Sequence, residues 1–142
     1  MHKTVAVAES CTGGLLGSLL TNKPGASDFF LGGILAYHDR VKRSLLGVPA
    51  GVLGKYGAVS RQTALLMAKN VRKKLGSSIG VAVTGIAGPS GGSAKKPVGL
   101  VYIALASAKK KKCRAFRFRG NRSEVRRKAA VAAFAWIQKE IF

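Results

Sequence analysis

Residues 3–20 read Lys-Thr-Val-Ala-Val-Ala-Glu-Ser-Cys-Thr-Gly-Gly-Leu-Leu-Gly-Ser-Leu-Leu, and this stretch decides the fold. Residues 3–8 form a short run rich in valine and alanine, which predicts a buried strand. The apolar residues 15–20 follow a Gly-Gly pair and end before Asn22 and Pro24, which predicts a helix. A strand that passes through a turn into a helix is a unit from which α/β proteins are built.

The rest of the chain continues this alternation of strands and helices. Further strands are expected at residues 29–37, 79–83, 98–106 and 113–118, the last with the alternation of basic and apolar residues that suits an edge strand. Helices are expected from an N-cap at Asp39 to Leu46, from Pro49 to Leu53, from an N-cap at Ser60 to Gly76, and from about Ser123 to Ile141. The order predicts a single α/β domain over residues 1–142, with a mixed, partly parallel sheet and helices on both faces.

The composition excludes several classes of protein. A length of 142 residues suits one domain, and no apolar run approaches the ~20 residues of a membrane-spanning helix. The start of the chain has no charged leader followed by a long apolar segment, so we expect a cytoplasmic protein. Two cysteines without a Cys-x-x-Cys pair, and only two histidines, favour neither a disulfide framework nor a zinc site. We expect no metal, no cofactor and no membrane contact.

The net charge is the most unusual bulk property of the chain. Twenty-five Lys and Arg residues against five acidic residues give a formal charge of +20. Such a charge suggests a polyanion-binding module, but the basic residues occur in almost every segment, which also fits a solvated basic surface. Both interpretations stay open here. We expect any nucleic-acid binding to lack sequence preference and to weaken steeply with salt.

Ser10 stands between the first strand and the first helix, a position that suits a nucleophile. The amides of Cys11, Thr12 and Gly13 are expected to be unpaired at the helix N-terminus, where they could receive an oxyanion. Gly13 and Gly14 would let a substrate approach the backbone closely. Other interpretations stay open: Ser10 or Thr12 only N-caps the helix, or Cys11 is the nucleophile or a buried packing residue.

A serine nucleophile needs a base, and neither of the two histidines is well placed. Tyr37 and Lys42 are five residues apart across a strand-to-helix junction, so both can face one cavity. A partly desolvated lysine can lose its proton near neutral pH, although Lys42 could equally be an exposed lysine. Ligands of open α/β sheets bind beyond the carboxyl ends of parallel strands, so Ser10, Tyr37 and Thr84 could meet at one rim.

A glycine-rich loop covers residues 84–93, Thr-Gly-Ile-Ala-Gly-Pro-Ser-Gly-Gly-Ser. Its backbone amides and hydroxyls suit a phosphate or a ribose. It lacks the Gly-x-x-x-x-Gly-Lys pattern of a P-loop, and a structural turn explains it equally well.

Six blocks of sequence are distinctive in composition and spacing. They are Ala8–Gly14, Phe30–Gly33 with Ala36-Tyr37, Lys42 before Leu45–Pro49, Gly57–Ser60, Val83–Pro89 and Lys96–Gly99. Together they resemble the CinA carboxy-terminal domain family, the nicotinamide-mononucleotide amidohydrolases, from about residue 4 to the C-terminus. The resemblance implies a three-layer α/β/α sandwich. It also implies hydrolysis of nicotinamide mononucleotide to nicotinate mononucleotide and ammonia, in pyridine-nucleotide recycling.

By position, the resemblance makes Ser10 the nucleophile, Lys42 its base and Tyr37 a hydroxyl beside that pair. It implies substrate contacts for residues in the first turn, in the glycine-rich loop and after the last strand. These are Cys11, Thr12, Gly13, Thr84, Gly85 and Arg122, of which Arg122 meets the nucleotide. The implied partner is a small-molecule nucleotide, with no specific nucleic acid, and a homo-oligomer is left open.

The chain departs from the family pattern at three places. The family commonly has Ser-Asn where this chain has His38-Asp39, an acidic residue near Lys95, and aspartate in place of Asn121. The first departure lies beside Tyr37 and bears on substrate and rate. The alternative to an amidase is therefore a member with lost or altered activity, and the chain resembles the stand-alone form of the domain.

Overall fold

The sheet of this protein has five strands in the spatial order β2-β1-β3-β4-β5. The structure, a computed structural model, describes residues 2–142. The strands are β1 (Val5–Glu9), β2 (Phe30–Leu35), β3 (Ile79–Gly85), β4 (Leu100–Ala106) and β5 (Lys111–Arg117). β1 pairs in parallel with β2 and β3, whereas β3–β4 and β4–β5 are antiparallel. The carboxyl ends of β1, β2 and β3 therefore meet at one end of the sheet.

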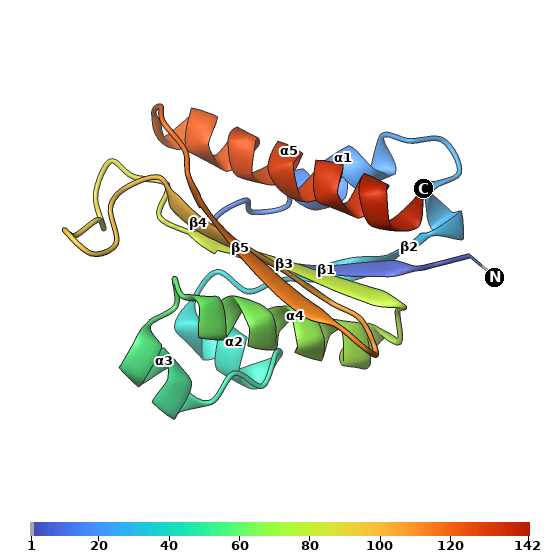
Figure 1. The fold of residues 1–142 in the computed structure, drawn as a ribbon, viewed down its shortest axis with the longest axis horizontal. Coiled ribbons are helices and arrows are strands. Elements are labelled where there is room, and N and C mark those ends of the chain that lie inside the picture. Colours follow the sequence, from blue (N-terminus) through green and yellow to red (C-terminus); the bar gives the residue numbers. More distant parts are fainter. Residues whose placement is uncertain (1) are drawn as a thin grey trace.

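Helices cover both faces of the sheet, so the predicted three-layer α/β/α sandwich is confirmed (Figure 1). The helices are α1 (Leu15–Thr21), α2 (Asp39–Ser44), α3 (Ala50–Tyr56), α4 (Arg61–Leu75) and α5 (Arg122–Ile141), with a 3-10 turn η1 (Ala26–Asp28). Figure 1 shows α1 and α5 on one side of the sheet and α2, α3 and α4 on the other.

Two apolar clusters form the core, one on each face of the sheet. Val7 of β1 faces α1 and α5, where Trp136 is buried, and the next residue, Ala8, faces α4. The residues on the α4 side are small, which lets this helix approach the sheet closely. A Cβ at Gly80 of β3 would lie 2.1 Å from the carbonyl oxygen of Ala68 on α4. Only glycine fits at this point of contact, because real Cβ atoms do not come so close to a carbonyl oxygen.

The boundaries of α4 follow the sequence prediction. The Ser60 hydroxyl accepts a hydrogen bond from the amide of Thr63 at 3.1 Å, as an N-cap residue does. Gly76 ends the helix in the left-handed conformation, with φ of 70°.

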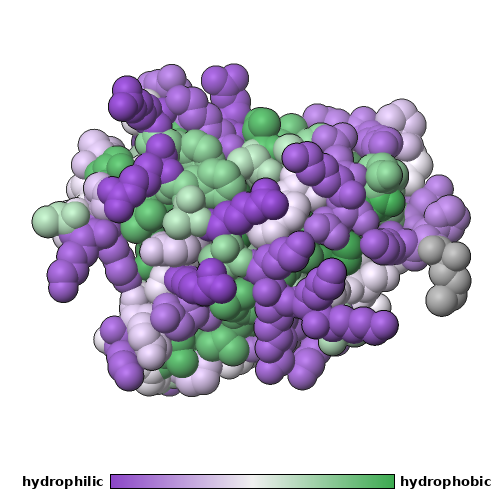
Figure 2. All heavy atoms as spheres, in the orientation of Figure 1, coloured by the Kyte–Doolittle hydropathy of each residue, from purple (hydrophilic) through white to green (hydrophobic). Residues whose placement is uncertain are grey.

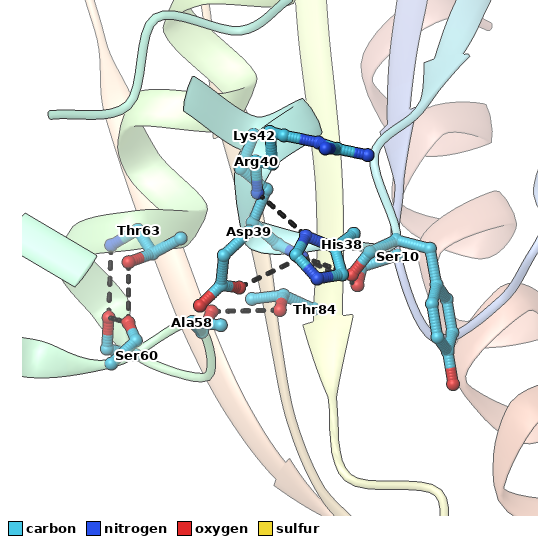
Figure 3. Close-up of polar contacts among 11 residues, drawn as sticks. Ser10, His38, Asp39, Arg40, Lys42, Ala58, Ser60, Thr63 and Thr84 are labelled. Carbon is cyan, nitrogen blue, oxygen red and sulfur yellow. Dashed lines mark hydrogen bonds and ion pairs between the residues drawn. The ribbon is translucent and has the colours of Figure 1, made fainter. Parts of the chain in front are cut away.

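Two other helix starts differ from the prediction by one residue. Asp39 was expected to cap α2, but the cap is His38, whose Nδ1 accepts from the amide of Arg40 at 3.0 Å (Figure 3). α5 begins at Arg122, because Asn121 and Glu124 form a reciprocal capping box in front of it. The shift in α2 leaves the Asp39 side chain free for other contacts.

Hydrophilic side chains are spread over the face of the molecule in Figure 2, with apolar patches between them. The outer strand β5 exposes Lys111, Lys112, Arg114 and Arg117, which confirms the predicted basic edge strand. Residues 107–110 form the turn between β4 and β5. Of the four consecutive lysines at residues 109–112, Lys111 and Lys112 therefore belong to the strand and not to the turn. No helix within residues 2–142 is both long and apolar enough to cross a membrane.

Candidate active site

A cavity of about 220 Å³ lies where the three parallel strands end. Ser10 directly follows β1, Tyr37 follows β2, and Thr84 is near the end of β3. All three line this cavity, as the strand order led us to expect. The complete lining is Ser10, Cys11, Tyr37, Asp39, Lys42, Ala58, Val59, Thr84, Gly85, Ala87 and Arg122.

The turn that carries Ser10 is held by its own backbone. The Ser10 amide donates to the carbonyl oxygen of Val83 on β3 at 3.0 Å, and the Gly13 amide donates to the Ser10 carbonyl oxygen at 3.1 Å. Gly13 and Gly14 have φ of 57° and 106°, which side chains with a Cβ rarely adopt. The two glycines thus fold the chain back after Ser10, so that its side chain remains at the end of β1.

Glu9, and neither Ser10 nor Thr12, satisfies the N-terminus of α1. One Glu9 carboxylate oxygen accepts from the amides of Gly14 at 3.1 Å and Leu16 at 2.9 Å, and the other accepts from Gly17 at 3.0 Å. The helix begins at Leu15 without a cap hydrogen bond from its cap residue. The helix-cap interpretation of Ser10 and Thr12 is therefore wrong, because a buried carboxylate takes that role.

The backbone amides expected to be free differ in part from the prediction. The Gly13 amide donates within the turn. Among residues 2–142, the amides of Cys11 and Thr12 donate to no other residue. These two amides directly follow Ser10. They are the donors that remain for a negatively charged oxygen formed beside the serine.

Ser10 and Lys42 are in direct contact inside the protein. The Lys42 Nζ lies 3.1 Å from the Ser10 Oγ, 2.8 Å from the Tyr37 carbonyl oxygen and 3.9 Å from an Asp39 carboxylate oxygen. The exposed fraction of Lys42 is 1%, so the alternative interpretation of Lys42 as an exposed lysine is wrong. Two sequence positions separated by 32 residues are thus joined, because β2 pairs in parallel with β1 and leads into α2, which carries Lys42.

Burial lowers the pKa of Lys42 below its ordinary value, since a charged ammonium loses hydration there. The nearby Asp39 carboxylate opposes this effect and raises the pKa. The lysine is therefore easier to deprotonate than one in water, and it lies within hydrogen-bond reach of a hydroxyl. A serine and a lysine in this arrangement can act as nucleophile and general base.

Tyr37 contributes to this pair through its backbone and not through its hydroxyl. Its carbonyl oxygen accepts from Lys42, whereas its hydroxyl accepts from Nη2 of Arg122 at 3.0 Å and its side chain is 62% exposed. The sequence prediction of a hydroxyl beside Ser10 and Lys42 is wrong for this structure. The ring points to the opening of the cavity, where Arg122 holds it.

Arg122, the first residue of α5, joins two parts of the cavity wall. Its Nη1 donates to the carbonyl oxygen of Gly88 in the glycine-rich loop at 2.8 Å, and its Nη2 reaches Tyr37. Thr84 has its hydroxyl engaged with the carbonyl oxygen of Ala58 at 2.9 Å (Figure 3). Gly85, which follows it, also lines the cavity.

Known proteins are similar to this chain in sequence and in fold. A sequence model described as the CinA C-terminal domain matches residues 1–141. The chain belongs to the CinA C-terminal domain family.

Relatives with sequences like this CinA domain carry names from competence and damage induction. A putative competence-damage inducible protein of Desulforudis audaxviator is 54% identical over 87% of this chain, and a CinA-like protein of Geotalea daltonii is 49% identical over 97%. The matched regions are 30% and 33% of those two proteins, so this chain spans about a third of their length.

Crystal structures of family members have the same fold. The competence/damage inducible protein CihA from Agrobacterium tumefaciens superposes with a TM-score of 0.93, at 41% identity, over 97% of this chain and 85% of that one. The competence damage-inducible protein A (ComA) of Klebsiella pneumoniae subsp. pneumoniae gives 0.93 at 31% identity, over 98% and 86%.

Cys11 lines the cavity of this CinA domain, but its thiol is poorly suited to attack. Burial raises the pKa of Cys11 to about 11, in spite of opposing effects from its own backbone and from Arg126. The lowering expected at a helix N-terminus does not prevail, because the turn places Cys11 before the helix and inside the protein. Lys42, the candidate base, is hydrogen-bonded to the Ser10 hydroxyl, so the geometry favours the serine over the thiol as nucleophile.

Two predicted substrate residues of this CinA domain, Thr12 and Gly13, do not line the cavity. Thr12 is fully buried, and its hydroxyl has no hydrogen-bond partner within residues 2–142. Gly13 is exposed beside Arg126. The Thr12 side chain therefore does not reach the space beside Ser10, and Thr12 could contact a substrate only through its backbone amide.

Sequence reasoning missed two residues that hold the turn of the CinA domain. Glu9 caps α1, and Arg126 of α5 donates to the carbonyl oxygens of Cys11 at 2.9 Å and Thr12 at 3.2 Å. An acidic residue at the end of a buried apolar strand was a usable signal for Glu9, because a buried carboxylate needs donors. Arg126 gave no signal, since it is one of many basic residues in α5.

A larger hollow of the CinA domain lies elsewhere and contains none of the predicted site residues. It measures about 550 Å³ and lies at the start of β3 and the end of β4, where five basic side chains surround it: Lys3, Arg72, Lys109, Lys110 and Lys112. We favour the smaller cavity as the active site because it contains the buried serine–lysine pair. Within residues 2–142, no group of three His, Cys, Asp or Glu side chains is placed to hold a metal ion.

Proposed function

We propose that this CinA domain is a nicotinamide-nucleotide amidase, which hydrolyses nicotinamide mononucleotide to nicotinate mononucleotide and ammonia. The observation that carries the proposal is the 3.1 Å contact between the buried Lys42 Nζ and the Ser10 Oγ in a cavity at the end of the parallel strands. The choice of nicotinamide mononucleotide as the substrate rests on the family resemblance described for the sequence. The cytoplasm is the compartment in which such recycling would take place.

The reaction begins with a proton transfer from Ser10 to Lys42. In the neutral form of Lys42, the Nζ lone pair accepts the Ser10 hydroxyl proton, and the oxygen attacks the carboxamide carbon. The negative oxygen then receives hydrogen bonds from the Cys11 and Thr12 amides. The proton passes from Lys42 to the leaving nitrogen, ammonia departs, and the chain is left with an ester at Ser10.

Water completes the cycle by the reverse proton path. Lys42 removes a proton from water, the hydroxide attacks the ester carbon, and Ser10 regains its proton as the carboxylate product leaves. Every group in this scheme is a side chain or amide of this chain, so the proposed mechanism needs no metal and no cofactor.

Arg122 supports a phosphate-bearing substrate. It lines the cavity, and a guanidinium can hold phosphate oxygens through two parallel hydrogen bonds. Its present partners are a carbonyl oxygen and a tyrosine hydroxyl, neither of which neutralises its charge. We propose that the nucleotide phosphate takes this place at the opening, while the carboxamide reaches Ser10.

Ammonia release from nicotinamide mononucleotide tests the proposal. Ser10→Ala and Lys42→Met should each reduce kcat by several orders of magnitude, and the double variant should be little worse, because the pair acts as a unit. Ser18→Ala, in an exposed residue of α1, and Lys55→Met, in an exposed residue of α3, are the matched controls and should keep full activity. Mass spectrometry should find a nicotinoyl adduct on Ser10.

Two results would contradict the proposal in different ways. A folded Ser10→Ala protein with normal turnover removes the serine mechanism. A folded wild-type protein that releases no ammonia from the mononucleotide favours the alternative of lost or altered activity.

The basic hollow near β5 provides the one structural argument for the polyanion alternative. Its five cations include the hairpin residues Lys109 and Lys110, and Glu140 is its only acidic lining residue. Binding of DNA that persists at physiological salt and depends on sequence would support this alternative. We expect weak binding that disappears as salt rises.

A further inference from the structure

Asp39 holds an unusual place among the few acidic residues of this protein. It is one of only five against 25 basic residues, and it is the only acidic residue that lines the cavity of Ser10. The ion pair between Asp39 and Lys42, at 3.9 Å, is the one salt bridge found among residues 2–142. The one ion pair of the described residues thus involves the lysine that is the proposed general base.

This ion pair conflicts with the role of the lysine. Lys42 can accept a proton only when it is neutral, and a neutral Lys42 leaves the Asp39 carboxylate without its cation. Asp39 is 56% exposed, so one side of its carboxylate remains open toward the cavity. A positive charge on a bound molecule would replace the Lys42 ammonium as the partner of the Asp39 carboxylate.

We infer that Asp39 is a positioning residue that links the charge of the substrate to the protonation of Lys42. Its carboxylate pairs with Lys42 in this structure and would pair with the cationic ring of a bound carboxamide. The inference rests on the proposed function for the identity of that ring, since the pyridine ring of nicotinamide mononucleotide carries a positive charge next to its carboxamide. Binding of such a ring offsets the carboxylate charge and so favours the neutral form of Lys42.

The other groups around Asp39 do not replace this effect. Lys42 also faces Ser10 and the protonated Cys11 thiol, and Arg122 stands across the cavity with a second positive charge. On its own helix, His38 uses Nδ1 for the Arg40 amide. The strand β3 and the segment before α4 bring only uncharged residues to the lining. Asp39 is thus the sole negative charge that a cationic ring can meet here.

Two small ligands separate ring charge from every other feature. Nicotinamide and 1-methylnicotinamide share the ring and the carboxamide, but only the second is a cation. Their binding to Ser10→Ala protein, which cannot turn them over, is measured by NMR titration of cavity amides at pH 7.5 and low salt. We expect the cation to bind between about 3-fold and 10-fold more tightly, a coupling typical of a half-exposed charge pair.

Removal of the Asp39 charge should abolish this preference. In Ser10→Ala with Asp39→Asn, the two ligands should bind equally within about twofold, and Asp39→Glu should restore part of the difference. The Lys42 side chain, followed through its ¹³Cε shift, should titrate at lower pH with the cation bound, and this change should vanish in Asp39→Asn. Asp28→Asn, which removes an exposed carboxylate of η1 that does not line the cavity, is the matched control and should keep the preference.

These outcomes separate the inference from the proposed function. If Asp39→Asn protein still prefers 1-methylnicotinamide over nicotinamide, the inference is overturned. It is also overturned if neither ligand shifts the NMR signals of the cavity amides. A charge preference that depends on Asp39, in a wild-type protein that releases no ammonia, keeps the inference and overturns the amidase.

Discussion

Replacement of Glu9 by glutamine tests whether a buried carboxylate organises the nucleophile turn. Glu9 is 2% exposed, and its two oxygens accept three amides at the start of α1: Gly14, Leu16 and Gly17. A glutamine of the same shape can keep the two bonds made by one oxygen. Its amide nitrogen then faces the Gly17 amide, so that two donors meet where a donor and an acceptor met before.

The cost follows from this geometry. An unsatisfied buried donor costs about 1–3 kcal/mol, and loss of a negative charge at a helix N-terminus adds about 0.3–1 kcal/mol. We therefore expect a loss of about 2–3 kcal/mol in the free energy of unfolding. Since 1 kcal/mol corresponds to roughly 2–4 °C in a domain slightly larger than this one, the Tm should fall by about 4–12 °C.

Thermal unfolding followed by circular dichroism at pH 7 measures this loss. Asp28→Asn removes an exposed acidic residue and should change stability by less than about 0.5 kcal/mol. Activity of the Glu9→Gln protein, assayed well below its Tm, should also fall, because Ser10 is the next residue. A Tm within 2 °C of the wild type would refute the argument that three charge-assisted bonds hold this turn.

Three further predictions concern side chains of the cavity. Burial lowers the pKa of Lys42, so activity should rise with pH below the ordinary lysine value of 10.5. Stability should also rise with pH between the lowered pKa and 10.5, because the unfolded chain binds more protons than the folded one in that range. Thermal melts at a series of pH values should show this slope, and Lys42→Met should flatten it. Since the pKa of Cys11 is raised to about 11, iodoacetamide should label this thiol only after unfolding, and Cys11→Ser should keep its turnover; loss of activity in that variant alone would transfer the nucleophile to the thiol. Arg122→Ala should raise KM for the mononucleotide by about 10-fold to 100-fold with little change in kcat, and an unchanged KM in steady-state assays would remove Arg122 from the phosphate site.

The order of strands and helices was predictable because local signals agreed. Valine-rich strands, Gly76 at a helix end and Ser60 as a helix cap each act within a few residues. The cap of α2 was placed one residue late, since both His38 and Asp39 have side chains that can accept from a helix amide. The pairing of β1 with β2 joins Val5 to Phe30, and its pairing with β3 joins Val5 to Ile79; both contacts are distant in sequence and were expected only from general rules for such sheets.

The site was predictable where position along a strand determines it, and not where a side chain chooses its direction. Ser10 and Thr84 reach the cavity because they end parallel strands. The hydroxyl of Tyr37 turns to Arg122, a partner 85 residues away that no local pattern reveals. The burial of Lys42 could not be separated from exposure by sequence, because 25 basic residues make any one of them ordinary.

The helix α5 ties the completion of the fold to the completion of the site. It follows every other element in the chain, and it covers α1 with Trp136 and Ile137 in the core of that face. The same helix brings Arg122 to the cavity and Arg126 to the turn after Ser10. During synthesis on the ribosome, the apolar face of β1, β3 and β4 thus stays uncovered until the twenty residues of α5 are made. A nascent chain that still exposes this face also lacks both arginines, so the proposed activity and protection from aggregation should begin together.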